Sequence, residues 1–300
     1  MSEIGKRWAV AAVGIPIVLV LLYIGGWPIA LVVAGFAALG AWECYRLADR
    51  GGVAALDWLG AAAAAALVLA AASQPTFTTF APVALGSIGT LTVVALVLAM
   101  AVRGPARKPL EVVAITVCGT IYVGLSLAFV PLLHAMPAER LWTYGSSVGA
   151  ASPAVNQWGG LMVVALPLAA TWIGDAAAFF VGRAWGKGGL APTISPNKSW
   201  AGVWAGLIGA GAAGVIWWLV ASAVLPAQPL GPVTAALVGV FLGVCAILGD
   251  LAESLLKREA GVKDSGTLLP GHGGVLDRID ALTFTLPAAY AALALVETLS

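Results

Sequence analysis

Long apolar segments separated by short polar ones dominate the pattern of this 300-residue chain. Apolar runs of about 20 residues recur, the length that a helix needs to cross the hydrocarbon core of a bilayer. The period-two alternation of a transmembrane β-barrel is absent. We therefore predict an all-α polytopic membrane protein of about nine transmembrane helices. The expected spans are residues 8–24, 28–46, 54–72, 80–102, 111–133, 159–182, 202–224, 231–250 and 280–298.

The distribution of Lys and Arg predicts how these helices are oriented. If the N-terminus lies in the cytoplasm, fourteen of the fifteen Lys and Arg residues fall in cytoplasmic segments and only Arg140 lies outside. Positive charge collects on the cytoplasmic side of membrane proteins. We therefore expect a multi-pass protein of the cell membrane with a cytoplasmic N-terminus, an external C-terminus and any chemistry facing the cytoplasm.

Composition narrows the class of protein and suggests that the two halves of the chain have different functions. Hydrophobic residues make up 61% of the sequence and charged residues 10%, against about a quarter charged in soluble domains. The net charge of +1 argues against a nucleic-acid partner. Residues 1–150 are expected to form a scaffold of about five helices. Residues 151–300 are expected to be catalytic, because the predicted cytoplasmic loops 183–201 and 251–279 hold most of the polar residues there.

Carboxylates near membrane depth are the first candidates for chemistry, because an acid there is costly and usually faces a cavity or a partner. Asp175 lies late in the sixth predicted span, where an ion pair with Arg183, two helical turns later, is an alternative explanation. The eighth span ends in a stripe that shares one helical face. Its members are Asp250, Glu253, Ser254 and Lys257.

A second pair of acids, Asp277 and Asp280, begins the ninth span after a loop rich in cations. Clustered carboxylates suit Mg²⁺, which binds few protein ligands together with substrate phosphates. Lys and Arg suit phosphate oxygens, and Gly273 and Gly274 allow backbone N–H groups to approach an anion. Together these features predict phosphoryl or nucleotidyl transfer.

The loop carries a recognisable pattern. From Ser254 to Asp280 the chain fits S-x-φ-K-R, four residues, K-D, a short gap and P-x-H-G-G-φ-x-D-R-φ-D, where φ is apolar. Every fixed position is met over these 27 residues. The segment resembles the signature of the phosphatidate cytidylyltransferase (CDP-diacylglycerol synthase) family.

Two upstream segments are similar to the same family. Residues 195–200 match S-P-x-K-[ST]-W, which in the family continues Glu-Gly, whereas here Ala201 replaces the acid. Asp175, with Phe179, Phe180, Gly182 and Arg183, resembles the family's D-x-x-A-[FY]-x-x-G-[RK] segment. Outside 171–200 and 250–280 the resemblance is one of membrane topology alone.

The resemblance implies that CTP and phosphatidic acid react, with Mg²⁺, to give CDP-diacylglycerol and pyrophosphate. Membrane lipids are the surroundings, and homodimers are expected from the family. Asp250 and Asp277 would hold the metal, assisted by Asp280 or Glu253, and a second cation is left open. The expected catalytic residues are Asp250, Asp277, Lys263 and His272.

The remaining candidates are expected to bind substrate. Basic residues of the long loop would hold phosphates of CTP and of the departing pyrophosphate, and Lys198 would hold the lipid phosphate or the nucleotide. The full set is Ser195, Asn197, Lys198, Ser254, Lys257, Arg258, Asp264, Gly273, Gly274 and Arg278. Three of these roles have alternatives: Lys257 and Arg258 as anchors to anionic headgroups, and Asp264 as a turn cap. His272 could likewise only shape its glycine turn.

Three rival functions are kept. A CTP-dependent kinase for a lipid alcohol such as a polyprenol would transfer the γ-phosphate and release CDP. A transporter would use Asp175 and Asp250 as ion sites and consume no CTP. An inactive scaffolding relative is a further alternative, because Ala201 replaces an acid.

Overall fold

A computed structural model describes residues 3–74, 76–102, 108–136, 153–225, 230–266 and 273–299. The chain divides into two compact units. Unit 1 comprises Met1–Leu132 and Leu256–Ile279, and unit 2 comprises Leu133–Leu255 and Asp280–Ser300. The functional division at residue 150 stays a prediction. The compact units divide the chain differently, because residues 256–279, called the signature loop below, belong to unit 1.

The secondary structure of the described residues consists of helices and one short two-stranded hairpin. The helices of unit 1 are α1 (Glu3–Ile24), α2 (Gly26–Arg50), α3 (Asp57–Ser73), α4 (Phe77–Val102), α5 (Pro109–Gly119), the π-helical turn η2 (Thr120–Leu125) and the short α10 (Leu276–Ile279). Unit 2 contains α7 (Pro153–Trp185), α8 (Trp200–Val224), α11 (Leu282–Leu299) and the strands β1 (Gly189–Ala191) and β2 (Ser195–Ser199). Helices α6 (Phe129–Met136) and α9 (Pro232–Glu259) each cross a unit boundary.

The predicted spans are largely confirmed. Within the described part of the chain, seven helices are long and apolar enough to cross a membrane, among them α2, α4, α7, α8 and α9. The first and third predicted spans correspond to shorter apolar helices, Gly14–Ile24 and Asp57–Ser73. Many large apolar side chains on these helices are exposed, as contact with lipid requires. The protein is therefore a multi-pass membrane protein.

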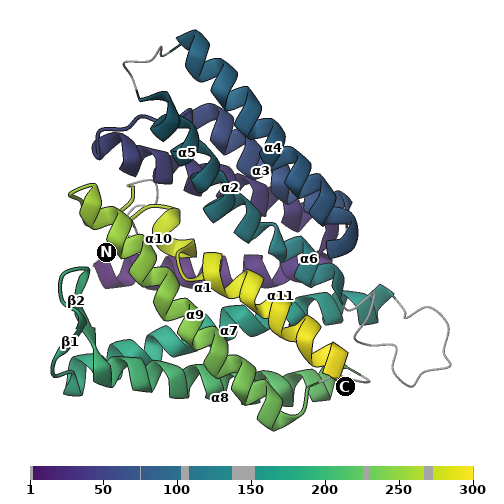
Figure 1. Cartoon of the computed structure of the whole chain (residues 1–300). Helices are drawn as coiled ribbons and strands as arrows, with labels where there is room; N and C mark the ends of the chain where they lie inside the picture. Colours follow the sequence, from purple (N-terminus) through teal and green to yellow (C-terminus); the bar gives the residue numbers. More distant parts are fainter. Residues whose placement is uncertain are drawn as a thin grey trace. The chain divides into compact units, whose positions relative to one another are not determined.

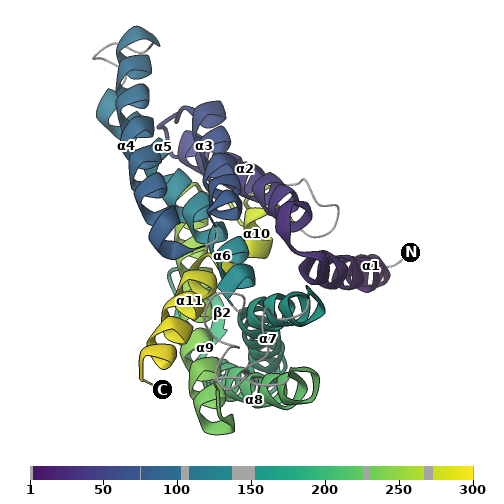
Figure 2. The same ribbon diagram turned by 90° about the vertical axis from the view of Figure 1, so that its right-hand side faces the viewer.

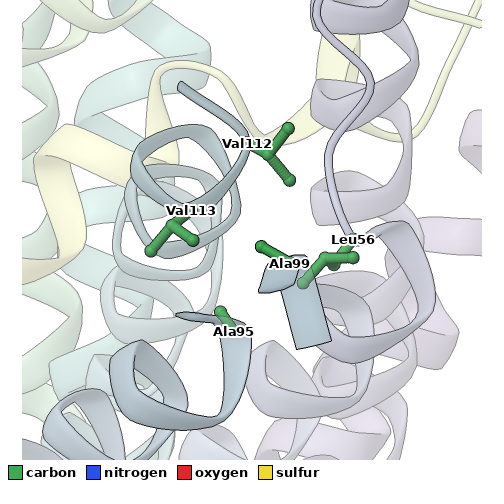
Figure 3. Packing of buried hydrophobic residues seen from close by; sticks show 5 residues of the cluster. All are labelled: Leu56, Ala95, Ala99, Val112 and Val113. Atoms are coloured by element: carbon green, nitrogen blue, oxygen red, sulfur yellow. The ribbon is translucent and has the colours of Figure 1, made fainter. Parts of the chain in front are cut away.

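Unit 1 is a bundle in which α2, α3, α4 and α5 pack together (Figure 2). A small apolar cluster joins the start of α3 to α4 and α5 (Figure 3); its residues are Leu56, Ala95, Ala99, Val112 and Val113. Tyr45 of α2 is fully buried and donates its hydroxyl to the Thr116 carbonyl at 2.9 Å. Gly60 and Gly119 leave room for its ring. A buried phenol needs such a partner, so these contacts fix α2 in the bundle.

Unit 2 is built on close packing of α7 against α8, with the β1–β2 hairpin at one end of the pair (Figure 1). Gly206 of α8 approaches Gly174 and Ala178 of α7 so closely that a Cβ would lie 3.3 Å from the Ala178 methyl. Gly202, four residues earlier on α8, also approaches Ala178 and Gly182, so this four-residue spacing of glycines lies at the helix contact. Gly239 of α9 likewise approaches the backbone of α8, where a Cβ would collide with the Ala210 carbonyl.

Candidate active site

The hairpin that follows α7 carries the first group of predicted site residues. Strands β1 and β2 are antiparallel, and Gly189 pairs with Ser199. Strand β2 leads into α8 with no intervening residue. Ser199 is the N-cap of α8, because its hydroxyl accepts a hydrogen bond from the Gly202 N–H at 3.2 Å. Lys198 is therefore held next to the first turn of a long helix.

A cleft of about 670 Å³ opens where these elements meet α9 within unit 2. The predicted binding residues of β2 line it together with carboxylates from two different helices. Its wall is formed by Asp175, Ala178, Phe179, Gly182 and Arg183 of α7, Ser195, Asn197, Lys198 and Ser199 of β2, Gly202 and Val203 of α8, and Ile247 and Asp250 of α9. The lining thus combines charged groups with apolar side chains.

The closest charge contact in the cleft joins Lys198 to Asp250, with 2.7 Å between Nζ and Oδ2. The Ser254 hydroxyl donates to the other oxygen of Asp250, Oδ1, at 3.3 Å. Both charged side chains keep part of their surface accessible, 22% for Lys198 and 37% for Asp250. The Lys198 side chain is therefore partly accessible from the cleft.

The two charges of α7 do not pair with each other. Among the described residues no ion pair joins Asp175 to Arg183, although the sequence left that pairing open, and both side chains line the cleft. With Lys198 and Asp250 they make two cations and two carboxylates around one space. A guanidinium facing this space is well suited to phosphate oxygens.

The second group of predicted residues lies in unit 1, around Asp277. Its Oδ1 accepts from the Lys257 ammonium at 2.8 Å, and the side chains are only 12% and 8% exposed. Its Oδ2 accepts from the Ser265 N–H at 3.0 Å and from the Gly274 N–H at 2.8 Å. Asp277 therefore fixes both the beginning and the end of the signature loop.

Gly273 and Asp280 have local roles around the same loop. Gly273 has a φ of 81°, and a Cβ there would lie 2.6 Å from Asp277 Oδ2, so only glycine fits without strain. Asp280, counted in unit 2, accepts a hydrogen bond from the Ala281 N–H at 2.8 Å.

The other predicted residues of this region are mostly accessible. Lys263, Asp264 and Arg278 are exposed, which suits contact with a soluble nucleotide. Arg258 is exposed too, and its guanidinium donates to the Val262 carbonyl at 3.2 Å. Glu253, in contrast, is fully buried. His272 lies outside the described residues, so its predicted role stays a prediction.

Comparison with known proteins settles the family. The sequence profile of the cytidylyltransferase family matches residues 5–296. The chain belongs to the cytidylyltransferase family. A phosphatidate cytidylyltransferase of Synechocystis is 31% identical over 299 residues, which cover 95% of this chain and 94% of that protein. Phosphatidate cytidylyltransferases of Brucella suis and Bacillus subtilis are 48% and 43% identical over 134 and 136 residues, just under half of each chain.

Two carboxylates of the cleft, Asp175 and Asp250, are candidate ligands for Mg²⁺. Asp175 and Asp250 line one cleft, and one oxygen of Asp250, Oδ2, is paired with the Lys198 ammonium at 2.7 Å. Mg²⁺ is typically bound by one or two carboxylates together with substrate phosphates and water. No cluster of three or more acidic, His or Cys side chains that could hold a metal occurs in the described part of the chain, and the Mg²⁺ site stays a prediction. The predicted sharing of one cation by Asp250 and Asp277 joins residues of different units and stays a prediction.

Glu43 is the residue of this region that sequence reasoning missed. It lies on α2, within the predicted span 28–46, and is only 1% exposed. Its Oε2 accepts from the Leu276 N–H at 2.7 Å and from the Ser265 hydroxyl at 3.1 Å. A lone acid inside an apolar run was the available signal, because such a residue usually has a partner.

Ala201, the departure from the family pattern, lies in the first turn of α8 directly after Trp200. The Ser199 hydroxyl already satisfies the Gly202 N–H in that turn. A helix start is therefore formed without the acidic side chain.

Proposed function

We propose that this protein is a phosphatidate cytidylyltransferase, which condenses CTP with phosphatidic acid to give CDP-diacylglycerol and pyrophosphate for phospholipid synthesis. The family match over nearly the whole chain supports this reaction, as does the name of the Synechocystis relative. The observation that carries the proposal is the cleft in which Lys198 contacts Asp250 beside Asp175 and Arg183. It combines groups for phosphates and a metal with apolar side chains.

The reaction is an in-line exchange at the α-phosphorus of CTP. A phosphate oxygen of phosphatidic acid forms the new bond to that phosphorus, and the bond from it to the bridging oxygen of the β-phosphate breaks. Pyrophosphate leaves with the electron pair. The attacking phosphate is already largely ionised at neutral pH, so no strong general base is required. Positioning and the neutralisation of negative charge are what the protein must supply.

The residues of the cleft divide this work. Lys198 and Arg183 bind phosphate oxygens, and Ser195 and Asn197 supply polar side chains beside them. Asp250, with Asp175 near it, would hold Mg²⁺. When bound, that ion supplies positive charge to the phosphates of CTP. Apolar lining residues such as Phe179 and Val203 would contact the acyl part of the lipid.

In this proposal, basic residues of the signature loop bind the nucleotide. Lys263 and Arg278 are exposed and bind phosphates of CTP, together with Arg258. Lys257 differs from them, because it is held by the Asp277 carboxylate at 2.8 Å. We place the reaction at the cytoplasmic face of the cell membrane, where CTP is available, and we propose that the protein acts as a homodimer.

The test uses the full-length protein in mixed micelles with phosphatidic acid, Mg²⁺ and CTP labelled on the α-phosphate. We expect the label in CDP-diacylglycerol and one pyrophosphate per product. Lys198→Met should remove most of the activity, whereas Lys187→Met should keep it, because exposed Lys187 lies just before the hairpin but does not line the cleft. Release of CDP without labelled lipid would instead indicate a kinase. Full activity of Lys198→Met would refute the role of the cleft.

A further inference from the structure

Glu43 places a carboxylate where an apolar helix packs against the signature loop of unit 1. Only Oε2 is used in the hydrogen bonds to Ser265 and Leu276. Oε1 has no hydrogen-bond partner among the described residues, and it faces Gly266, where any side chain would collide with it. Burying a carboxylate in this way is costly, so a carboxylate at this position calls for a role beyond filling space.

Ser265 connects Glu43 to the Asp277–Lys257 pair. Its hydroxyl lies 3.1 Å from Glu43 Oε2 and 3.0 Å from Asp277 Oδ2. A hydroxyl has one proton to donate, so the two carboxylates share it. Glu43 is thereby linked through one side chain to the carboxylate that holds Lys257.

The same face of α2 also positions α10. Gly40, about one turn before Glu43, is approached by the Ile279 side chain, and a Cβ at Gly40 would lie 2.9 Å from Ile279 Cδ1. The Leu276 N–H donates to Glu43, and both Leu276 and Ile279 are buried. Helix α2 therefore fixes the segment that carries Asp277 by an apolar contact and a polar one.

We propose that Glu43 is a positioning residue for the transferase reaction. It acts through Ser265 and Leu276, which keep Asp277 and Lys257 in their places, and it touches no substrate itself. The inference rests on the proposed function, but the geometry that carries it belongs to unit 1 alone. It assigns to α2, in the region expected to be scaffold, a part in forming the catalytic loop.

The first experiment compares Glu43→Ala and Glu43→Gln by steady-state kinetics per mole of folded protein. We expect Glu43→Ala to lower kcat at least about tenfold while KM for CTP changes less than about threefold, because groups that contact CTP remain present but misplaced. Glu43→Gln should retain at least about half of kcat, since its amide oxygen can still accept from Leu276.

Two controls separate positioning from loss of stability. Tyr45 lies on α2, the helix that also carries Glu43. Tyr45→Phe removes its buried hydroxyl hydrogen bonds to Thr116 and Thr120 and leaves the signature loop unchanged. Glu111→Ala removes an exposed carboxylate of unit 1. Both should keep kcat per folded molecule. If Tyr45→Phe lowered kcat as much as Glu43→Ala at equal stability loss, or if Glu43→Ala kept full kcat, the proposal would be overturned.

Hydrogen exchange gives a readout that does not depend on activity. In Glu43→Ala the amides of Ser265, Gly274 and Leu276 should exchange at least about tenfold faster, while α3 and α4 are unchanged. Unchanged exchange in these amides, with an active wild type, would overturn the positioning role. An inactive wild type would instead overturn the proposed function, and the exchange measurement would then decide the positioning role alone.

Discussion

Replacing Lys257 by Met tests how strongly the Asp277 contact stabilises unit 1. The change keeps the length of the side chain but removes the ammonium that lies 2.8 Å from Asp277 Oδ1, in a pair only 12% and 8% exposed. Breaking a buried ion pair from one side costs about 3–5 kcal/mol, because the remaining charge stays away from water. Two N–H donors still bind Asp277 Oδ2, so we expect about 3 kcal/mol, the lower end.

The assay is unfolding of the purified protein by SDS in mixed micelles, followed by circular dichroism. Lys108→Met is the matched control, because Lys108 pairs with Glu111 at 3.0 Å but the side chains are 64% and 47% exposed. That pair should contribute at most about 1 kcal/mol. Adding Asp277→Asn to Lys257→Met should recover part of the loss. An equal effect of the two lysine substitutions would refute the assignment of a buried pair.

Three further predictions concern the loop, the helix contacts and the metal. Gly273→Ala should lower both yield and kcat, because φ is 81° and the new methyl meets Asp277; expression and labelled-CTP turnover test this. Gly239→Val should reduce the heat stability of the detergent-solubilised protein, because the new side chain would collide with the Ala210 carbonyl. Gly231→Val should leave the heat stability unchanged, because a Cβ at Gly231 meets nothing within 4 Å. Chelation should abolish pyrophosphate release and added Mg²⁺ should restore it; unchanged turnover after thorough chelation would contradict a metal role for Asp250.

The helices were predictable from the sequence because a membrane span is specified by length and hydrophobicity alone. The alanine-rich third span shows the limit of that rule, since it is a helix of 17 residues, Asp57–Ser73. The β1–β2 hairpin was not predicted, since strands of three and five residues show no alternation, and Ser195–Ser199 is polar throughout. The four-residue spacing of Gly202 and Gly206 permits a close helix contact, but it does not specify their partners on α7.

The sequence was sufficient to predict which residues belong to the site, but not which of them contact each other. Asp175, Lys198 and Asp250 were all expected on one side of the membrane, and in unit 2 they line one cleft. That Lys198 pairs with Asp250 follows from packing of α8 against α9, which no local pattern encodes. Glu43 was missed because its partners lie more than 220 positions away in the chain.

The contact between α2 and the loop near Ser265 has a consequence for chimaeric proteins. These two segments are separated by 222 positions yet meet at one carboxylate. A hybrid that joins the front half of one homologue to the back half of another would pair a carboxylate with a foreign loop. Exchange of halves is therefore not modular here, and domain-swap libraries must transfer residues 40–43 together with 265–279 as one block.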